Sequence, residues 1–232
     1  PPPPPPHPPC TLHSPRHTPV ATPPNTFALS KDGQRVNVSL VAVARAVDVS
    51  DTATLPRVKS IRTEGGIHNV YVTPDGRWVV AGSIPGKKVI VIDQKTEEVA
   101  WSLPTDDGVR PMAFDTNADG STKRIFVQLS NFNGFLTVDF ATHKVVDKVA
   151  LPDLGTEKIT EGLQGAPAHG LIVTPDGKTL GVLSKMNSRL YSYPLTALKL
   201  LGHANVGPPP YCVTATPQRS RASPAPPPAH PV

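Results

Sequence analysis

Cysteines and long apolar runs are scarce in this sequence. Its 232 residues include two cysteines, Cys10 and Cys212, which form neither a Cys-x-x-Cys pair nor a metal-ligand spacing. No apolar run reaches the ~18 residues that a membrane-spanning helix needs, so we expect no membrane span. The first residues also lack the basic start and apolar core of a secretory signal peptide.

Clustered positive charge is scarce too. The formal net charge is +5, but three of the 23 basic residues, Arg16, Arg219 and Arg221, lie in terminal segments without acidic residues. The other 20 are scattered among 18 acidic residues. Binding of nucleic acid requires a basic stripe or patch, and we therefore expect no nucleic-acid partner.

Proline, by contrast, is abundant and unevenly placed. Of the 30 prolines, twelve lie in residues 1–24 and nine in residues 208–232. Consecutive prolines have a fixed φ and no N–H group, so they favour solvated polyproline II over sheets or helices. We therefore expect disordered Pro-rich tails at residues 1–24 and 218–232, on either side of an ordered region at residues 25–217.

The ordered region contains a repeated segment that ends in an Asp-Gly turn. Two copies are close in sequence, NVYVTPDG at residues 69–76 and GLIVTPDG at residues 170–177. Looser copies lie at residues 26–33 and 111–120, and residues 211–217 begin another. The aspartates of the four turns are 43, 44 and 57 residues apart. A period of ~40–45 residues is typical of propeller blades.

Each period has the pattern of four short strands. In the second period we expect strands at residues 68–73, 77–82, 88–93 and 99–103, joined by turns rich in Pro, Gly and Asp. The third strand of the first period is expected to end at Asp48. Helical periodicity is nearly absent. The sequence therefore predicts an all-β fold, a β-propeller of four-stranded antiparallel blades.

The motif Tyr71-Val72-Thr73-Pro74-Asp75-Gly76, followed by Val89-Ile90-Val91-Ile92-Asp93, resembles the repeat of the YVTN β-propeller proteins. That family is related to the propellers of quinoprotein amine dehydrogenases, cytochrome d1 nitrite reductases and lactonases. The resemblance covers about residues 25–217. It implies a ring that closes with seven blades and a periplasmic or extracellular location.

Fewer blades than seven can be counted in this chain. We expect four, at residues 25–66, 67–108, 109–167 and 168–210, and residues 211–217 supply the first strand of a fifth. After Pro217 the pattern calls for Asp-Gly, but proline and arginine follow. We therefore expect a partial, incomplete propeller of the seven-bladed type, whose open blade edges favour self-association.

One polar position recurs at the entry to each innermost strand. Alignment of the turns places there Asn25, His68, Arg110, His169 and Tyr211. In a propeller this position lies at the mouth of the central channel. Two histidines and an arginine suit an anion, a metal or the edge of a cofactor, but such residues can also cap backbone groups or line a wet channel. No carboxylate accompanies them in the repeat, which disfavours zinc.

The third period is longer than the others, and most of the extra residues fall at 155–167. A long loop on a rigid scaffold often carries binding residues, and Glu157, Lys158 and Glu161 are the candidates here. A solvated linker is the alternative interpretation.

The turn of the third period resembles the first half of a calcium loop, with Asp115, Asn117 and Asp119 at alternate positions. Lys123 and Phe126 stand where later ligands are needed. We therefore favour an enlarged hairpin turn and expect no metal site.

Two functions stay open. The favoured one is a non-catalytic binding or scaffold module that recognises a protein or small-molecule ligand at the channel mouth and the 155–167 loop. The alternative is an enzyme, either a lactonase or a redox protein that holds a haem d1 or quinone-type cofactor, with His68 or His169 as ligand or proton carrier. The sequence has no acidic cluster, no Cys-x-x-Cys-His motif and no tryptophan pair suited to a quinone, so we expect no cofactor.

Overall fold

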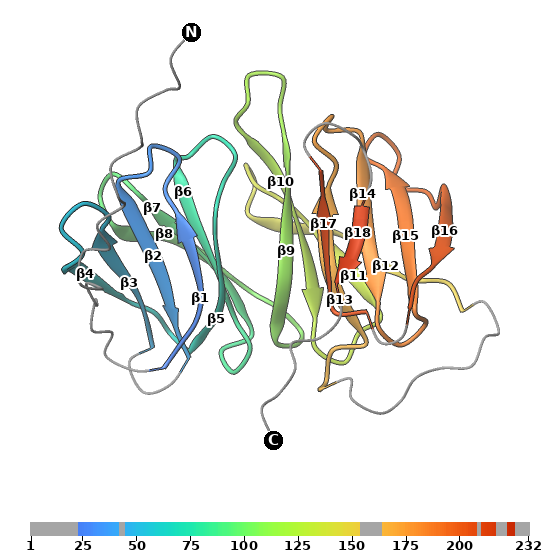
Figure 1. Cartoon of the computed structure of the whole chain (residues 1–232), viewed down its shortest axis with the longest axis horizontal. Coiled ribbons are helices and arrows are strands. Elements are labelled where there is room, and N and C mark those ends of the chain that lie inside the picture. The colour runs from blue at the N-terminus through green and yellow to red at the C-terminus, as the bar shows by residue number, and fades with distance from the viewer. Residues whose placement is uncertain (1–22, 42–44, 154–163, 208–209, 217–221, 226–232) are drawn as a thin grey trace, which may run out of the picture.

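The computed structural model describes residues 23–41, 45–153, 164–207, 210–216 and 222–225 (Figure 1). These residues form eighteen strands and no helix, and no helix capable of crossing a membrane occurs in them. The expected Pro-rich tail at residues 1–24 lies almost entirely outside the described residues.

Sixteen of the strands form four sheets of four antiparallel strands, paired in chain order. The first blade consists of β1 (Pro24–Leu29), β2 (Arg35–Leu40), β3 (Ala46–Asp51) and β4 (Arg57–Arg62). The second consists of β5 (Ile67–Val72), β6 (Trp78–Ser83), β7 (Lys88–Asp93) and β8 (Glu98–Pro104). The third consists of β9 (Val109–Thr116), β10 (Thr122–Leu129), β11 (Gly134–Asp139) and β12 (Lys144–Ala150). The fourth consists of β13 (Ala168–Val173), β14 (Thr179–Ser184), β15 (Arg189–Pro194) and β16 (Gly202–Asn205). The predicted all-β fold of four-stranded antiparallel blades is confirmed.

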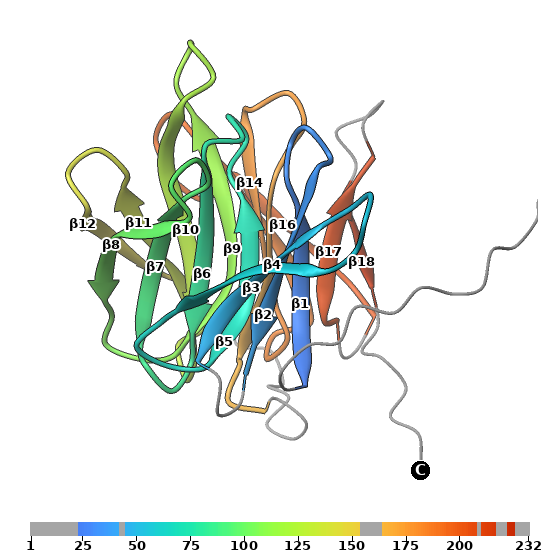
Figure 2. The same cartoon turned by 90° about the vertical axis from the view of Figure 1, so that its left-hand side faces the viewer.

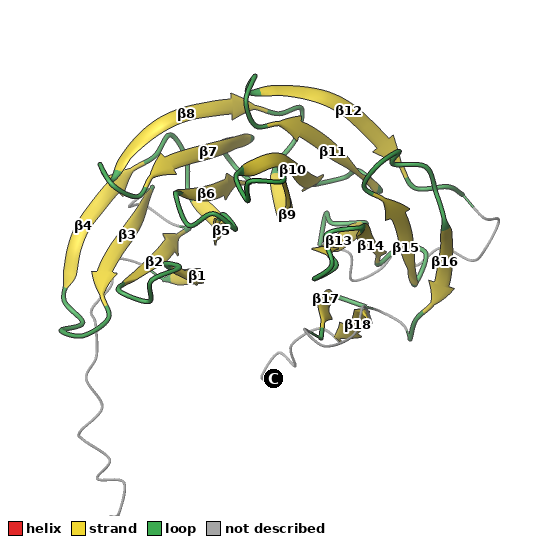
Figure 3. Ribbon diagram, turned by 90° about the horizontal axis from the view of Figure 1, so that it is seen from above, coloured by secondary structure: helices red, strands yellow, loops and turns green. Residues whose placement is uncertain are grey.

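The blades stand side by side around a common centre. Seen from above, β1, β5, β9 and β13 lie innermost and β4, β8, β12 and β16 outermost, along an arc that is open between β1 and the C-terminal hairpin (Figure 3). Figure 2 shows the first blade facing the viewer. Each innermost strand contacts the innermost strand of the next blade, from β1 through β5 and β9 to β13.

The hydrophobic core lies between blades rather than within one. Val89 and Val91 of β7 pack toward the third blade, whereas Ile90 and Ile92 pack toward the first. Alternate side chains of a strand point to opposite faces, and both faces of a blade are covered, so the middle strands carry continuous apolar runs. The outermost strands cover one side only, and most of β12 is exposed.

The Asp-Gly turns of the repeat are fixed by a hydroxyl and a carboxylate. In the second blade, Thr73 Oγ1 donates to Asp75 Oδ1 at 2.5 Å, and the N–H of Arg77 donates to the same oxygen at 3.0 Å. Gly76 adopts a φ of 76°, which favours glycine. The other carboxylate oxygen of Asp75 accepts the N–H of Thr122 in the third blade at 3.2 Å. The repeated motif therefore shapes the turn and joins neighbouring blades.

The third strand of the first blade ends at Asp51, so the expected end at Asp48 was wrong. Asp51 Oδ1 accepts the N–H groups of Ala53 at 3.0 Å and Thr54 at 2.9 Å, which closes the turn. Asp48 lies in the middle of β3 with a fully buried side chain. The pattern contains two aspartates three residues apart, and Asp51 is the one whose carboxylate caps the turn.

The C-terminal hairpin differs from the expected single strand. β17 (Cys212–Ala215) pairs antiparallel with β18 (Ala222–Ala225), which falls in residues assigned above to the tail at 218–232. Pro224 lies in β18 opposite Val213. A two-stranded sheet leaves both strands as edges, and an edge strand tolerates the missing N–H of proline.

Candidate functional site

The five predicted mouth residues occupy the entries of the five innermost strands. Asn25 lies in β1, His68 in β5, Arg110 in β9 and His169 in β13, while Tyr211 directly precedes β17. The structure joins them in two pairs, Asn25 with His68 and His169 with Tyr211. Arg110 lies between the pairs. Burial is the main cause of the lowered pKa of both histidines, and the charge of Arg110 adds to it.

Asn25 and His68 hydrogen-bond to neighbouring groups of the first two blades. Asn25 Nδ2 donates to the carbonyl oxygen of His68 at 2.5 Å, which links the first two blades. The Nδ1 atom of His68 lies 2.7 Å from Asn69 Oδ1, and burial is the main reason that the pKa of His68 is lowered. Asn25 is exposed and fits the capping role that was the alternative interpretation.

His169 is the most unusual residue of the group. Its side chain is almost fully buried, and its Nδ1 atom lies 2.9 Å from the carbonyl oxygen of Tyr211. A carbonyl only accepts, so Nδ1 carries the proton and Nε2 is left with a lone pair. Nε2 is buried and has no hydrogen-bond partner. Burial, with smaller effects of Lys185 and Arg110, lowers the pKa of His169 to about 4.

A buried glutamine fixes the strand that carries His169. Gln128 of β10 accepts the N–H of Gly170 at 2.7 Å and donates to the carbonyl of Leu183 at 3.3 Å. The backbone on the C-terminal side of His169 is thereby tied to the third blade and to β14. This bonding holds the imidazole in one place, because the adjacent main chain has partners on both sides.

Arg110 is half-buried and joins the mouth to the long loop. Its Nε donates to Ser130 Oγ at 2.9 Å, and one terminal nitrogen donates to the carbonyl of Gln164 at 2.8 Å. Burial lowers the pKa of Arg110, but a guanidinium stays charged at neutral pH. The acidic residue whose charge reaches Arg110, Asp107, accepts from Asn131 at 3.0 Å and lies 3.9 Å from Lys87.

Lys185 also belongs to this group, although the sequence analysis missed it. It follows β14, its side chain is 1% exposed, and its Nζ lies 4.6 Å from the centre of the Tyr211 ring. Burial, and then the charge of Arg110, lowers the pKa of Lys185. The signal was present in the sequence, since the ends of β6 and β14 align as Ser83-Ile84 and Ser184-Lys185 and a lysine replaces an isoleucine.

Arg110, His169, Lys185 and Tyr211 together form what we call the mouth cluster. The imidazole of His169 and the ring of Tyr211 have centres 4.2 Å apart, and Lys185 lies over the same Tyr211 ring. Three of the four residues are basic, and burial opposes the charge on each of the three. A negatively charged ligand would favour all three charged forms at once.

The other predicted site residues are either outside the described residues or occupied by the chain itself. Glu157, Lys158 and Glu161 fall in residues 154–163, which the structure does not describe. Of the calcium candidates, Asp115 pairs with Arg124, Asn117 donates to Ser121 Oγ at 2.9 Å, and Asp119 accepts the N–H of Ser121 at 2.9 Å. In the described part of the chain, no three His, Cys, Asp or Glu side chains are placed to share a metal ion.

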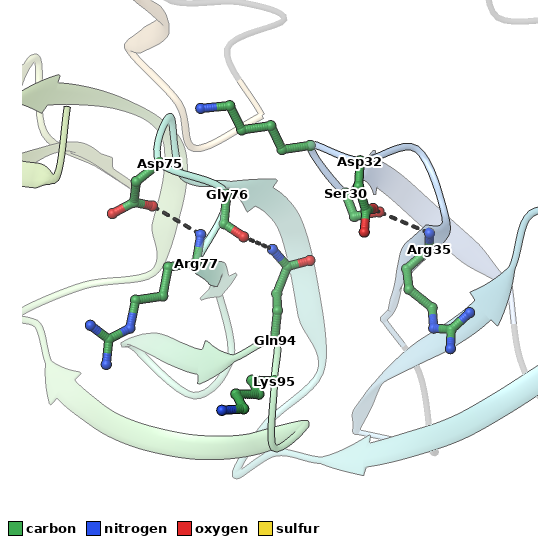
Figure 4. A pocket seen from close by; sticks show the side chains of 9 residues that line it. Ser30, Asp32, Arg35, Asp75, Gly76, Arg77, Gln94 and Lys95 are labelled. Carbon is green, nitrogen blue, oxygen red and sulfur yellow. Dashed lines mark hydrogen bonds between the residues drawn. The ribbon is translucent and has the colours of Figure 1, made fainter.

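A groove of about 490 Å³ lies between the turns of the first two blades (Figure 4). Its polar groups largely bind one another: Lys31 Nζ donates to the carbonyl of Pro74 at 2.9 Å, and Gln94 Nε2 donates to that of Gly76 at 2.5 Å. The carboxylates of Asp32 and Asp75 hold their own turns. The groove is therefore part of the joint between blades, and the mouth cluster is the better candidate for a ligand site.

No family model matches the sequence, and no curated protein matches it. Among solved structures, the chain is similar to the β-propeller domain of Cps50 (Swd1) from Myceliophteria thermophila, with a TM-score of 0.69 and 14% sequence identity. The match covers 85% of this chain and 60% of that one, so this chain spans less than two thirds of that domain. At this identity the likeness shows the fold alone. The protein has a β-propeller fold with blades of four antiparallel strands.

Proposed function

We propose that this chain is a YVTN-type β-propeller protein that acts as a binding module and recognises its ligand at the mouth cluster. The observation that carries the proposal is the buried, unpartnered Nε2 atom of His169 beside two further basic side chains. A buried polar atom without a partner is costly, and native proteins contain few of them. A ligand that supplies the missing hydrogen bond explains why the cost is tolerated.

The long loop supports the same location. The carbonyl of Gln164, in the 155–167 segment, accepts from Arg110, and the N–H of Asn131 donates to the carbonyl of Gly165 at 2.9 Å. The end of the loop is thus fastened beside the mouth cluster. A ligand that reorients Arg110 would break its hydrogen bond to the carbonyl of Gln164. Ligand binding would then change how the end of this loop is held.

Binding fits the cluster better than catalysis does. General acid-base chemistry requires a group that exchanges protons near neutral pH, but burial lowers the pKa of His169 to about 4. The nearby carboxylate of Asp107 is held by Asn131 and by the N–H of Gly108 at 2.7 Å. Among the described residues of the mouth, His169 therefore suits recognition better than general acid-base catalysis.

Thermal unfolding with a panel of small molecules tests this proposal. The panel contains inorganic phosphate, a dicarboxylate, a neutral sugar, a primary amine and a nucleoside. We expect at least one compound to raise the Tm of the wild-type protein by roughly 5 to 10 °C at a hundredfold excess over Kd. The same compound should not stabilise Arg110→Gln.

The matched control is Arg62→Gln, which removes an exposed arginine from the outermost strand of the first blade. It should respond to the panel like the wild-type protein. If no compound distinguishes Arg110→Gln from the wild type and the control, the mouth cluster is not a ligand site.

A further inference from the structure

The first blade has one neighbour in the arc, the second blade, and its other face borders the opening of the arc (Figure 3). Val47 and Val49 of β3 point toward the second blade, where they join its hydrophobic core. Directly paired residues of neighbouring strands share a face of the sheet. The face at the opening therefore consists of two cross-strand rows, Phe27–Val38–Asp48 and Leu29–Val36–Ser50. It belongs to a different blade from the mouth cluster.

Two positions on this face differ from those of the other blades. In the second, third and fourth blades, the residues aligned with Asp48 and Ser50 are apolar or aromatic, and they are buried in the cores between blades. These residues are Ile90 and Ile92 in β7, Leu136 and Val138 in β11, and Tyr191 and Tyr193 in β15. An ordinary apolar blade on this face would leave a carboxylate against hydrocarbon, which is costly. The face therefore suits a polar partner.

The carboxylate of Asp48 and the hydroxyl of Ser50 each have an atom without a hydrogen-bond partner. The side chain of Asp48 is fully buried, and Ser50 is 5% exposed. Asp48 Oδ2 lies 3.4 Å from Arg57 Nη1, but Asp48 Oδ1 and Ser50 Oγ have no partner. A carboxylate accepts hydrogen bonds, whereas a hydroxyl also donates one. The matching partner thus brings a donor, best a charged one, and a carbonyl oxygen that accepts.

The chain itself contains such a donor close to this face. Residues 1–22 precede β1 and lie outside the described residues, and Arg16 is the only Lys or Arg among them. Arg16 precedes Pro24, the first residue of β1, by eight residues, and an extended chain of that length spans up to about 26 Å. From Pro24, Asp48 lies two strands across the sheet and three residues along it, about 10 Å in each direction. Arg16 can therefore reach Asp48.

We propose that residues 11–22 form a strap over β2 and β3 of the first blade, in which the guanidinium of Arg16 donates to Oδ1 of Asp48. A main-chain carbonyl of the strap accepts the hydroxyl of Ser50. A proline-rich segment suits this role, because polyproline II makes no internal hydrogen bonds and leaves its carbonyls available. The segment contains no acidic residue that would compete with Asp48 for Arg16.

The remaining contacts of the strap are apolar. Val36 and Val38 of β2 lie beside the two polar residues and are half-buried, so they offer surface to proline rings. Phe27 and Leu29 lie at the inner border of the face and stay outside the strap. Composition predicts disorder for the segment on its own, but such segments become ordered on contact with a partner. Direct attachment to β1 makes this contact intramolecular, which raises the effective concentration of Arg16 at the face to about the millimolar range.

Trypsin cleavage after Arg16 in the folded full chain tests the proposal, with the products followed by mass spectrometry. The reference is a synthetic peptide of residues 9–24, in which the same bond is freely accessible. We expect the wild-type chain to be cut there at least about tenfold more slowly than the peptide, because the charge-assisted hydrogen bond has to open first. Asp48→Asn should lose most of this protection. The matched control is Asp147→Asn, which removes a carboxylate from the exposed strand β12 and should be protected like the wild type.

Urea unfolding gives a second measurement. Arg16→Gln should lower the urea midpoint of the wild-type protein but leave that of Asp48→Asn nearly unchanged, because the charge that Arg16 binds is already removed. Equal shifts in the two backgrounds would overturn the proposal, as would cleavage of the wild-type chain as fast as the peptide. If Asp48→Asn does not fold, the wild-type cleavage rate and the effect of Arg16→Gln on the wild-type midpoint decide, and absence of either effect overturns the strap. Protection that disappears on dilution would assign the segment to a second copy of the chain and would also overturn it.

Discussion

Burial of His169 should make the stability of the protein depend on pH between about 4 and 6.5. In the unfolded chain the imidazole has its ordinary pKa of 6.5, and in the folded protein burial lowers the pKa to about 4. Between these values the unfolded chain binds a proton that the folded protein excludes. The free energy of unfolding is therefore highest above pH 6.5 and falls as the pH decreases toward 4.

The size of this effect follows from the two pKa values. The whole interval from 6.5 to about 4 corresponds to roughly 3 kcal/mol. By pH 5, about 2 kcal/mol of this is lost. The carboxylates whose pKa values are lowered, such as those of Asp32 and Asp139, stay ionised at pH 5 and add little in this range.

Urea unfolding at pH 7 and pH 5 measures the effect, with His169→Gln and His203→Gln as the variants. Glutamine cannot take up a proton in this range, so His169→Gln should lose about 2 kcal/mol less than the wild-type protein between the two pH values. His203 is exposed on β16, and its variant should behave like the wild type. Equal losses in the wild type and His169→Gln would refute a buried, neutral imidazole.

Three further predictions concern the blades. Gly66→Ala should lower the free energy of unfolding in urea by about 3 kcal/mol, because a Cβ there would clash with the carbonyl oxygen of Val41. The control is Gly202→Ala, whose Cβ would meet nothing within 4 Å, and it should cost under about 0.5 kcal/mol. Asp75→Ala removes a turn cap and a bond to the third blade, and it should lower the free energy of unfolding by about 2 kcal/mol; a neutral result would contradict the role of the repeat motif. The apolar side chains of Phe27 and Leu29 on β1 are 74% and 54% exposed. Their replacement by serine should lower the fraction of self-associated protein measured by sedimentation. A wild-type protein that is already monomeric would contradict self-association through this edge.

The fold could be predicted from the sequence because the same solution recurs in every blade. A turn is predicted by the motif Thr73-Pro74-Asp75-Gly76, whose hydroxyl, carboxylate and glycine each stabilise it. The spacing between copies of this motif predicts the length of a blade. The hairpin β17–β18 was not predicted as a pair, because proline in the sequence argues against a strand and the exception for edge strands depends on the final pairing. The end of β3 was misplaced for a similar reason, since either of two aspartates fits the pattern.

The mouth cluster could be predicted only in part, because its residues vary from blade to blade whereas the turn residues recur. Asp75 and its counterparts are nearly the same in each blade because they build the same turn, whereas the mouth position is Asn, His, Arg and His in the four blades and Tyr before the C-terminal hairpin. A residue that only closed the backbone would be expected to recur, as the turn residues do. Lys185 fits the same rule, since the corresponding residue of the second blade is Ile84. In a repeat protein the positions that depart from the repeat, and that the fold then brings to one place, are those available for binding. A comparison of blade with blade therefore separates structural residues from candidate ligand residues, and the placement of Lys185 over the ring of Tyr211 is the part that only the folded chain could supply.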